Sequence, residues 1–202
     1  MPLWFDSRPL VLASKSEVRA NILGAAGLRV EIRPAAIDER AAEAGAAPND
    51  AIGAARLLAR AKAKGVGATE PGRMMLGADQ TLALDGQRFS KPRDRADGRA
   101  QLQALRGKTH MLHSALALTR GDTVLFEHAD TARLTMRTFS DRFLDDYLDL
   151  AGDAALACVG GYQIEGAGIH LFERVEGDYF TILGLPLLPL LGFLRQAGFV
   201  AK

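Results

Sequence analysis

Residues 74–86 read MMLGADQTLALDG and contain the clearest structural signal in the chain. The apolar run from Met74 to Ala78 indicates a buried strand, and Asp79 is the first charge that this run admits. Thr81 to Leu84 continues the strand, and Asp85-Gly86 is the strongest short signal for a hairpin turn, from which a second strand returns. A carboxylate that ends a buried apolar run is enriched among catalytic groups, so Asp79 is the first candidate for a functional residue.

A strand followed by a helix is expected near the start of the chain. Leu10 to Ala13 is short and apolar, Ser16 is the expected helix cap, and Gly27 is a plausible stop in the left-handed conformation. Free backbone N–H groups at a helix start attract anions such as phosphate, and Ser14 and Arg19 lie in this turn. The alternative is that Ser16 only caps the helix and that Arg19 is solvated.

The rest of the chain alternates between helical and strand patterns. We expect a half-exposed strand over 29–33, helices over 50–64, 94–106 and 187–197, strands over 111–118, 123–136 and 169–175, and a helix from Ser140 with Phe143, Tyr147 and Leu150 facing inward. This order predicts one α/β domain over residues 1–202: an elongated mixed sheet with flanking helices and two lobes around a cleft.

Composition excludes several classes of function. The 202 residues include 25 Lys and Arg against 24 Asp and Glu, so no broad basic surface is available to bind a nucleic-acid polymer. The single Cys158 excludes an internal disulfide and fits a reducing compartment. The first residues lack the pattern of a secretory leader, and the most apolar segment, 182–194, is shorter than the roughly 20 residues of a bilayer span. We therefore expect a cytoplasmic protein without a membrane contact.

The common nucleotide-binding signatures are missing from the sequence. It contains neither the glycine-rich P-loop pattern nor the G-x-G-x-x-G pattern after a strand. His110 and His113 are three apart on an expected strand and so point to opposite faces, which disfavours a histidine metal site. One chemical alternative is a haloacid-dehalogenase-like phosphatase with Asp79 as nucleophile. That family has a second Asp two positions later, where this chain has Thr81.

A series of short motifs runs from residue 10 to about 195. They are LVLASKS at 10–16 with Arg19, Ile37-Asp38-Glu39, Ala61-Lys62-Ala63-Lys64, Gly77-Ala78-Asp79-Gln80, Ser90-Lys91-Pro92, Gly107-Lys108-Thr109-His110, and Glu176-Gly177-Asp178-Tyr179 with Gly184-Leu185-Pro186. In this order and spacing they resemble the Maf family. Its members are nucleoside triphosphate pyrophosphatases with an α/β fold similar to the inosine triphosphate pyrophosphatases.

The resemblance implies hydrolysis of a nucleoside triphosphate to the monophosphate and pyrophosphate, with a divalent cation and often in a homodimer. Asp79 matches the family's proton acceptor, which would deprotonate a water for attack at the α-phosphorus. Glu39 matches a loop carboxylate that, with Asp79, would hold Mg²⁺ or Mn²⁺. The phosphate-contacting positions of the family match Ser14, Arg19, Lys62 and Lys91.

The resemblance also bears on the choice of base. Gln80 and Glu165 are similar to the 7-methyl-GTP pyrophosphatase branch, whereas the dTTP/UTP branch has Thr and Gln at these positions. A carboxylate at Glu165 would accept hydrogen bonds from guanine and favour a cationic, N7-methylated base. One departure opposes this preference, because Val18 replaces an aromatic or basic residue and cannot stack on a methylated base. Cys158 stands where many relatives have Lys, so one basic contact at the entrance to the glycine-rich stretch is expected to be absent.

A non-enzymatic alternative also follows from the family. Its name is linked to septum formation and to cell-division arrest, which suggests a regulatory binding protein. A protein that only binds partners has no need of Asp79, Glu39 and Lys91 at the ends of strands, so the sequence favours the enzyme.

Overall fold

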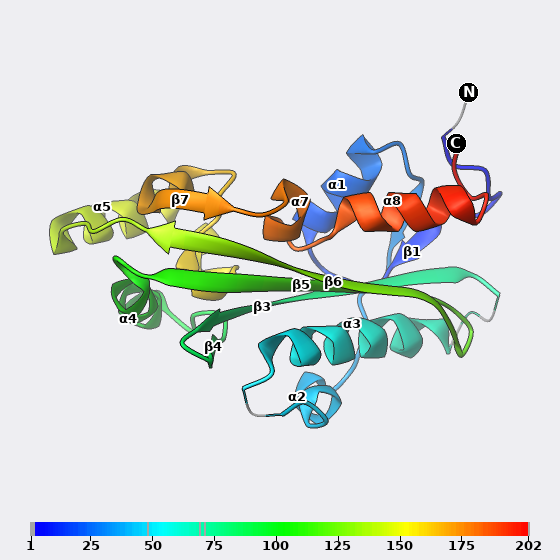
Figure 1. Cartoon of the computed structure of the whole chain (residues 1–202), viewed down its shortest axis with the longest axis horizontal. Coiled ribbons are helices and arrows are strands. Elements are labelled where there is room, and N and C mark those ends of the chain that lie inside the picture. Colours follow the sequence, from blue (N-terminus) through cyan, green and yellow to red (C-terminus); the bar gives the residue numbers. More distant parts are fainter. Residues whose placement is uncertain (1–2, 48, 69, 71, 202) are drawn as a thin grey trace.

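The computed structural model describes residues 3–47, 49–68, 70 and 72–201. A seven-stranded mixed sheet runs along the molecule in the order β2-β1-β3-β5-β6-β7, and β4 pairs with β3 beside this path (Figure 1). The strands are β1 (Leu10–Leu12), β2 (Val30–Ile32), β3 (Met74–Leu84), β4 (Gln87–Phe89), β5 (Thr109–Arg120), β6 (Thr123–Met136) and β7 (Phe172–Glu176). Strand β1 is parallel to β2 and β3, and the other pairings are antiparallel.

Helices cover both faces of this sheet. They are α1 (Glu17–Ala25), α2 (Glu39–Glu43), α3 (Ala51–Gly67), α4 (Arg95–Leu105), α5 (Asp141–Ala151), α6 (Asp153–Leu156), α7 (Tyr179–Ile182) and α8 (Leu187–Gln196), with 3-10 turns at Val159–Gly161 and Ala167–Leu171. Figure 1 shows α2 and α3 on one face, α1, α7 and α8 on the other, and α4 and α5 at the far end. Among the residues described, no helix combines the length and apolar character that a membrane crossing requires.

Local signals set the element boundaries as the sequence predicts. Ser16 and Ser140 cap α1 and α5, each accepting a hydrogen bond from the backbone N–H three residues later. Gly27 has a φ of +77° and follows α1. Asp85 and Gly86 both have positive φ, as the tight turn between β3 and β4 requires. The expected mixed α/β architecture with flanking helices is confirmed.

Alternation along β3 divides the core. The even-numbered face contributes to two clusters, the α1/α8 cluster, which includes Leu76 and Ala78, and the α4/α5 cluster, which includes Leu82 and Leu84. The odd-numbered face packs on α3, where Gly77 allows close approach because a Cβ there would lie 2.0 Å from the carbonyl oxygen of Ala59. One face of the sheet thus carries two separate apolar cores. The expected cleft between two lobes stays a prediction.

Three expectations from the sequence are wrong in detail. Asp79 does not end a strand, because β3 is continuous over 11 residues and Asp79 pairs with Ala115 of β5. The strand expected over 169–175 begins only at Phe172, after a 3-10 turn. On α5, Leu150 is 75% exposed, because it lies outside the buried stripe of the helix, whose members are three or four residues apart. The buried residues of that stripe are Leu144, Tyr147 and Leu148.

A buried histidine joins the α4/α5 cluster to the glycine-rich segment that follows α6. His110 Nε2 lies 2.6 Å from the hydroxyl of Tyr162, and within the described part of the chain its Nδ1 has no hydrogen-bond partner. Burial lowers the pKa of His110 from 6.5 to about 4, so the ring is neutral in the folded protein at neutral pH.

This histidine is expected to make the fold sensitive to acid. Between pH 6.5 and 4 the unfolded chain binds a proton that folded His110 does not, so stability falls as pH falls, by about 3 kcal/mol over the window. Urea unfolding at several pH values should show a weaker acid loss in His110→Gln than in the wild type. The exposed His170→Gln serves as the control, and parallel pH curves for wild type and His110→Gln would contradict the assignment.

Candidate active site

The candidate site lies at a gap in one edge of β3. Strand β5 pairs with β3 over Met74–Ala83 on one side. On the other side, β1 pairs with β3 as far as Leu76, and the pairing of β4 with β3 starts at Leu82. Within the described residues no strand therefore pairs with positions 77–81 of this edge. Both β1 and β4 run toward the gap and end there. The carboxyl ends of strands beside an open edge are favoured positions for ligand sites.

Asp79 points from this segment toward α3, where its carboxylate forms an ion pair with Lys62, which also pairs with Glu39. Lys62 Nζ lies 2.6 Å from Asp79 Oδ1 and 2.8 Å from Oε1 of Glu39, the first residue of α2. The side chains of Lys62 and Asp79 are 13% and 12% exposed, whereas that of Glu39 is 60% exposed. Three residues predicted from the sequence therefore form one contiguous group.

The pKa of Asp79 is raised above its ordinary value of 3.8. Burial is the largest cause, and the charge of Glu39 acts in the same direction. The charges of Lys62 and Arg19 oppose this rise without cancelling it. A carboxylate that is easier to protonate than usual is a better proton acceptor at neutral pH.

Arg19 reaches the gap from the opposite face of the sheet. Its Nη1 donates to the carbonyl oxygen of Ala78 at 2.7 Å and to Ser14 Oγ at 3.2 Å, and its Nε donates to the carbonyl oxygen of Gly184 at 2.8 Å. Arg19 is buried, and burial lowers its pKa. It forms no ion pair with any described carboxylate, and Nη2 donates to no described residue. A buried guanidinium that contacts only neutral oxygens is suited to an anionic ligand.

The two serines before α1 have different roles. Ser16 Oγ caps the helix by accepting from the backbone N–H of Arg19 at 3.4 Å. Ser14 Oγ accepts from Arg19 and from the backbone N–H of Ser16 at 3.2 Å, so its own hydroxyl proton is left to donate to a ligand. The alternative of a solvated Arg19 is wrong, because this side chain is buried against β3.

Lys91 and Glu165, two other residues predicted for the site, are linked by the structure to Cys158. Both side chains are exposed, and both act electrostatically on the thiol of Cys158. Burial raises the pKa of this thiol, Glu165 raises it further, and Lys91 and Arg19 lower it. Cys158 is thus the common neighbour through which these charges are linked, and no direct contact joins Lys91 or Glu165 to Arg19 within the described residues.

The other two predicted specificity residues face away from Asp79. Gln80 points to the opposite face of β3, where its Nε2 lies 2.9 Å from the carbonyl oxygen of Ile182 and 3.0 Å from Ser114 Oγ. Val18 packs against the α1/α8 cluster. Ser114, Thr181 and Gly184 were not predicted as site residues, and the Gly184-Leu185-Pro186 motif is the one sequence signal that bears on them.

The carboxylates fit a divalent cation only together with a substrate. Within the described residues no group of three His, Cys, Asp or Glu side chains could hold a metal ion. Asp79 and Glu39 do converge, since both contact Lys62. Magnesium is commonly held by one or two carboxylates plus phosphate oxygens and water, so this two-carboxylate donor set suits it when a triphosphate supplies the remaining oxygens.

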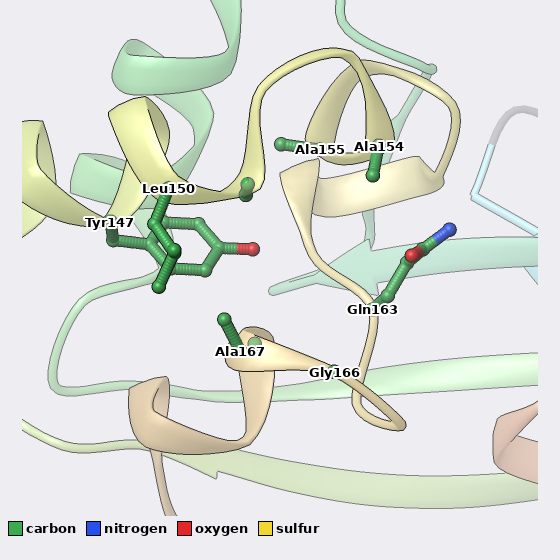
Figure 2. Close-up of a pocket in the computed structure, with 9 residues that line it drawn as sticks. Tyr147, Leu150, Ala154, Ala155, Gln163, Gly166 and Ala167 are labelled. Carbon is green, nitrogen blue, oxygen red and sulfur yellow. The ribbon is translucent and has the colours of Figure 1, made fainter.

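Two cavities lie away from this group. One, of about 270 Å³, is lined by Tyr147, Ala154 and Ala167 among others, and Figure 2 shows Gln163 pointing away from the ring of Tyr147. The other, of about 430 Å³, lies between the start of α3 and strands β5 and β6. Neither is lined by Asp79, Lys62 or Arg19, so these two cavities are separate from the candidate site.

Comparison with known proteins shows the family of the chain. A family model described as Maf-like protein matches residues 9–197. The chain belongs to the Maf family. A Maf relative from Nitrobacter winogradskyi, named nucleoside triphosphate pyrophosphatase, is 53% identical over 97% of each chain. A relative from Rhizobium etli, named 7-methyl-GTP pyrophosphatase, is 50% identical over 94% of this chain and 96% of its own.

A solved structure gives a weaker likeness. The dITP/XTP pyrophosphatase from Mycobacterium abscessus aligns over 94% of each chain at 15% identity with a TM-score of 0.41. This structural similarity is too weak to assign site residues in the Maf chain. The candidate site is therefore described from the contacts of the chain itself.

Proposed function

We propose that this chain hydrolyses a nucleoside triphosphate to the monophosphate and pyrophosphate. One observation carries the proposal. A single gap holds a buried carboxylate with a raised pKa, Asp79, and a buried guanidinium, Arg19, whose hydrogen bonds all go to neutral oxygens. The carboxylate of Asp79 is suited to accept a proton, and the guanidinium of Arg19 is suited to bind a phosphate. The names of relatives at about half identity support the same reaction.

The phosphates would lie between β1 and β4. Arg19 Nη2, the hydroxyl of Ser14 and the free N–H groups at the start of α1 are the donors on one side. Lys91, which follows β4, supplies charge on the other side. These groups would stabilise the negative charge that develops on the leaving pyrophosphate.

Asp79 would act on the attacking water. Its carboxylate accepts the proton while the water oxygen attacks the α-phosphorus and the bond to the pyrophosphate oxygen breaks. Lys62 holds this carboxylate in place through a hydrogen bond of 2.6 Å. Glu39 and Asp79 would hold Mg²⁺ or Mn²⁺ together with phosphate oxygens, and the ion, when bound, would neutralise charge on the triphosphate.

Base preference rests on Glu165. Its exposed carboxylate acts electrostatically on Cys158 and could accept hydrogen bonds from the N1–H and amino group of guanine. A methylated guanine carries a positive charge that this carboxylate would favour, and one relative is named for that substrate. We therefore propose 7-methyl-GTP as the first substrate to examine, with other triphosphates beside it.

Identification of the released product tests the proposal. The wild type is incubated with normal and N7-methylated triphosphates and Mg²⁺ or Mn²⁺, and pyrophosphate and inorganic phosphate are measured separately. We expect a nucleoside monophosphate and pyrophosphate in equal amounts. Release of inorganic phosphate alone would identify a phosphatase instead. No product above that of Asp79→Asn with any triphosphate would overturn the proposal.

A further inference from the structure

A row of polar residues crosses the sheet between its two apolar cores. Gln80 of β3 pairs with Ser114 of β5, which pairs with Asp130 of β6. On one side of this row Ala78 pairs with Leu116 in the α1/α8 cluster, and on the other Leu82 pairs with Leu112 in the α4/α5 cluster. We call Gln80, Ser114 and Asp130 the polar seam.

The polar seam holds helix α7 against the sheet. Ser114 Oγ donates to the carbonyl oxygen of Thr181 at 2.7 Å, and Gln80 Nε2 lies 3.2 Å from the same oxygen and 2.9 Å from that of Ile182. The hydroxyl of Thr181 donates to Asp130 Oδ2 at 3.2 Å. Thr181 and Ser114 are fully buried. The seam thus binds the carbonyl oxygens of Thr181 and Ile182 at the end of α7.

The end of α7 leads directly to Arg19. Gly184 has a φ of +91°, its N–H donates to the carbonyl oxygen of Thr181, and the N–H of Leu185 donates to that of Phe180. These two bonds form a Schellman motif, which fixes the direction of the Gly184 carbonyl. That carbonyl oxygen accepts the hydrogen bond from Arg19 Nε at 2.8 Å.

Gly184 also approaches the guanidinium closely. A Cβ on this residue would lie 3.2 Å from Arg19 Nη2 and 3.3 Å from Nε, so the backbone of the motif forms a wall against the flat side chain. Gly184 therefore contacts Arg19 in two ways, through the hydrogen bond to Nε and through packing against the guanidinium.

We propose that the polar seam positions the guanidinium of Arg19 through α7 and the Gly184 turn. Gln80 and Ser114 are positioning residues in this scheme: they act on a ligand only through Arg19. Gln80 Nε2 has two N–H groups and three acceptors in reach, so it keeps no donor for a substrate. The effect on turnover rests on the proposed pyrophosphatase function, whereas the effect on the Arg19 side chain does not.

A direct measurement follows the Nε–H signal of Arg19 by NMR. The signal is assigned by its loss in Arg19→Lys, and its exchange with water is measured in the wild type, Ser114→Ala and Gln80→Met. We expect exchange to speed up by about tenfold in both seam variants, because the Gly184 carbonyl moves. Thr119→Val is the matched control, since Thr119 is a buried hydroxyl on the same strand whose Oγ1 has no hydrogen-bond partner within the described residues.

A kinetic measurement tests the same link through activity. Ser114→Ala is expected to lower kcat/KM by about tenfold in the wild type but by less than about twofold in Arg19→Lys, because residues that act through one group are not additive. Thermal unfolding of each variant accompanies the kinetics. A purely structural seam would lower the Tm and reduce activity equally in both backgrounds.

The outcomes separate the two proposals. If the wild type releases no pyrophosphate but the Arg19 signal responds to Ser114→Ala, the proposed function fails and the positioning role stands. If the enzyme is active and neither the signal nor the coupling responds beyond the Thr119→Val control, the positioning role is overturned. Gln80→Met removes seam contacts to Thr181 and Ile182 from a different strand, so a folding defect in one seam variant does not decide the result.

Discussion

Replacing Asp79 with Asn is expected to reduce the rate of pyrophosphate release by about 10³-fold. The amide keeps the size and most of the contacts of the carboxylate but cannot accept the proton from the attacking water. The loss should fall on kcat, because the phosphates are bound mainly by Arg19, Ser14 and Lys91. Steady-state kinetics with quantified pyrophosphate measures the change.

The same substitution should not weaken the fold. Burial raises the pKa of Asp79, so the charged carboxylate costs stability, and this cost grows as pH rises from 3.8 through the raised pKa. The amide carries no such cost, and Lys62 keeps Glu39 as a partner at 2.8 Å. The Tm of Asp79→Asn at neutral pH should therefore equal or exceed that of the wild type. A low Tm together with low activity would point to misfolding instead.

The activity of the wild type should also depend on the protonation of Asp79. A general base works only when deprotonated, so kcat/KM rises with pH through the raised pKa of this carboxyl, above 3.8. The exposed Asp122→Asn, in the turn between β5 and β6, is the matched control and should keep both the rate and the pH profile. An identical acidic limb in Asp79→Asn would assign that limb to another group.

Local sequence signals predicted much of the fold because their physical cause is local. A serine caps a helix through a backbone N–H three residues away, as Ser16 and Ser140 do. Asp85-Gly86 specifies a turn through its own backbone angles. These rules require no knowledge of distant parts of the chain.

The site was only partly predictable because its details depend on distant contacts. A carboxylate inside a continuous strand is stable here because Lys62 and Arg19, from two different helices, lie beside it. The sequence alone allowed Arg19 to be solvated, since its acceptor Gly184 is 165 residues away. The side of β3 on which Gln80 acts follows from strand parity, but its partners Thr181 and Ile182 do not.

Replacing Arg19 with Lys is expected to reduce kcat/KM by about 10²- to 10³-fold. Lysine keeps the positive charge, but a single ammonium group cannot contact the carbonyl oxygens of Ala78 and Gly184 while it also offers two N–H groups to a phosphate. Kinetics with the preferred triphosphate measures the loss. Calorimetric binding of inorganic tripolyphosphate measures the phosphate affinity without any contribution from the base.

Charge and geometry can be separated at this residue. If charge alone mattered, Arg19→Lys would retain activity and tripolyphosphate affinity within about threefold, and the fork of the guanidinium would have no role. Arg195→Lys, at the exposed end of α8, controls for the general effect of this exchange and should match the wild type. Asp79 provides the opposite comparison, since Asp79→Asn should lose turnover but keep its affinity for tripolyphosphate when binding is measured without a divalent cation. A loss of affinity in Arg19→Lys with none in Asp79→Asn would place phosphate binding on Arg19 and proton transfer on Asp79.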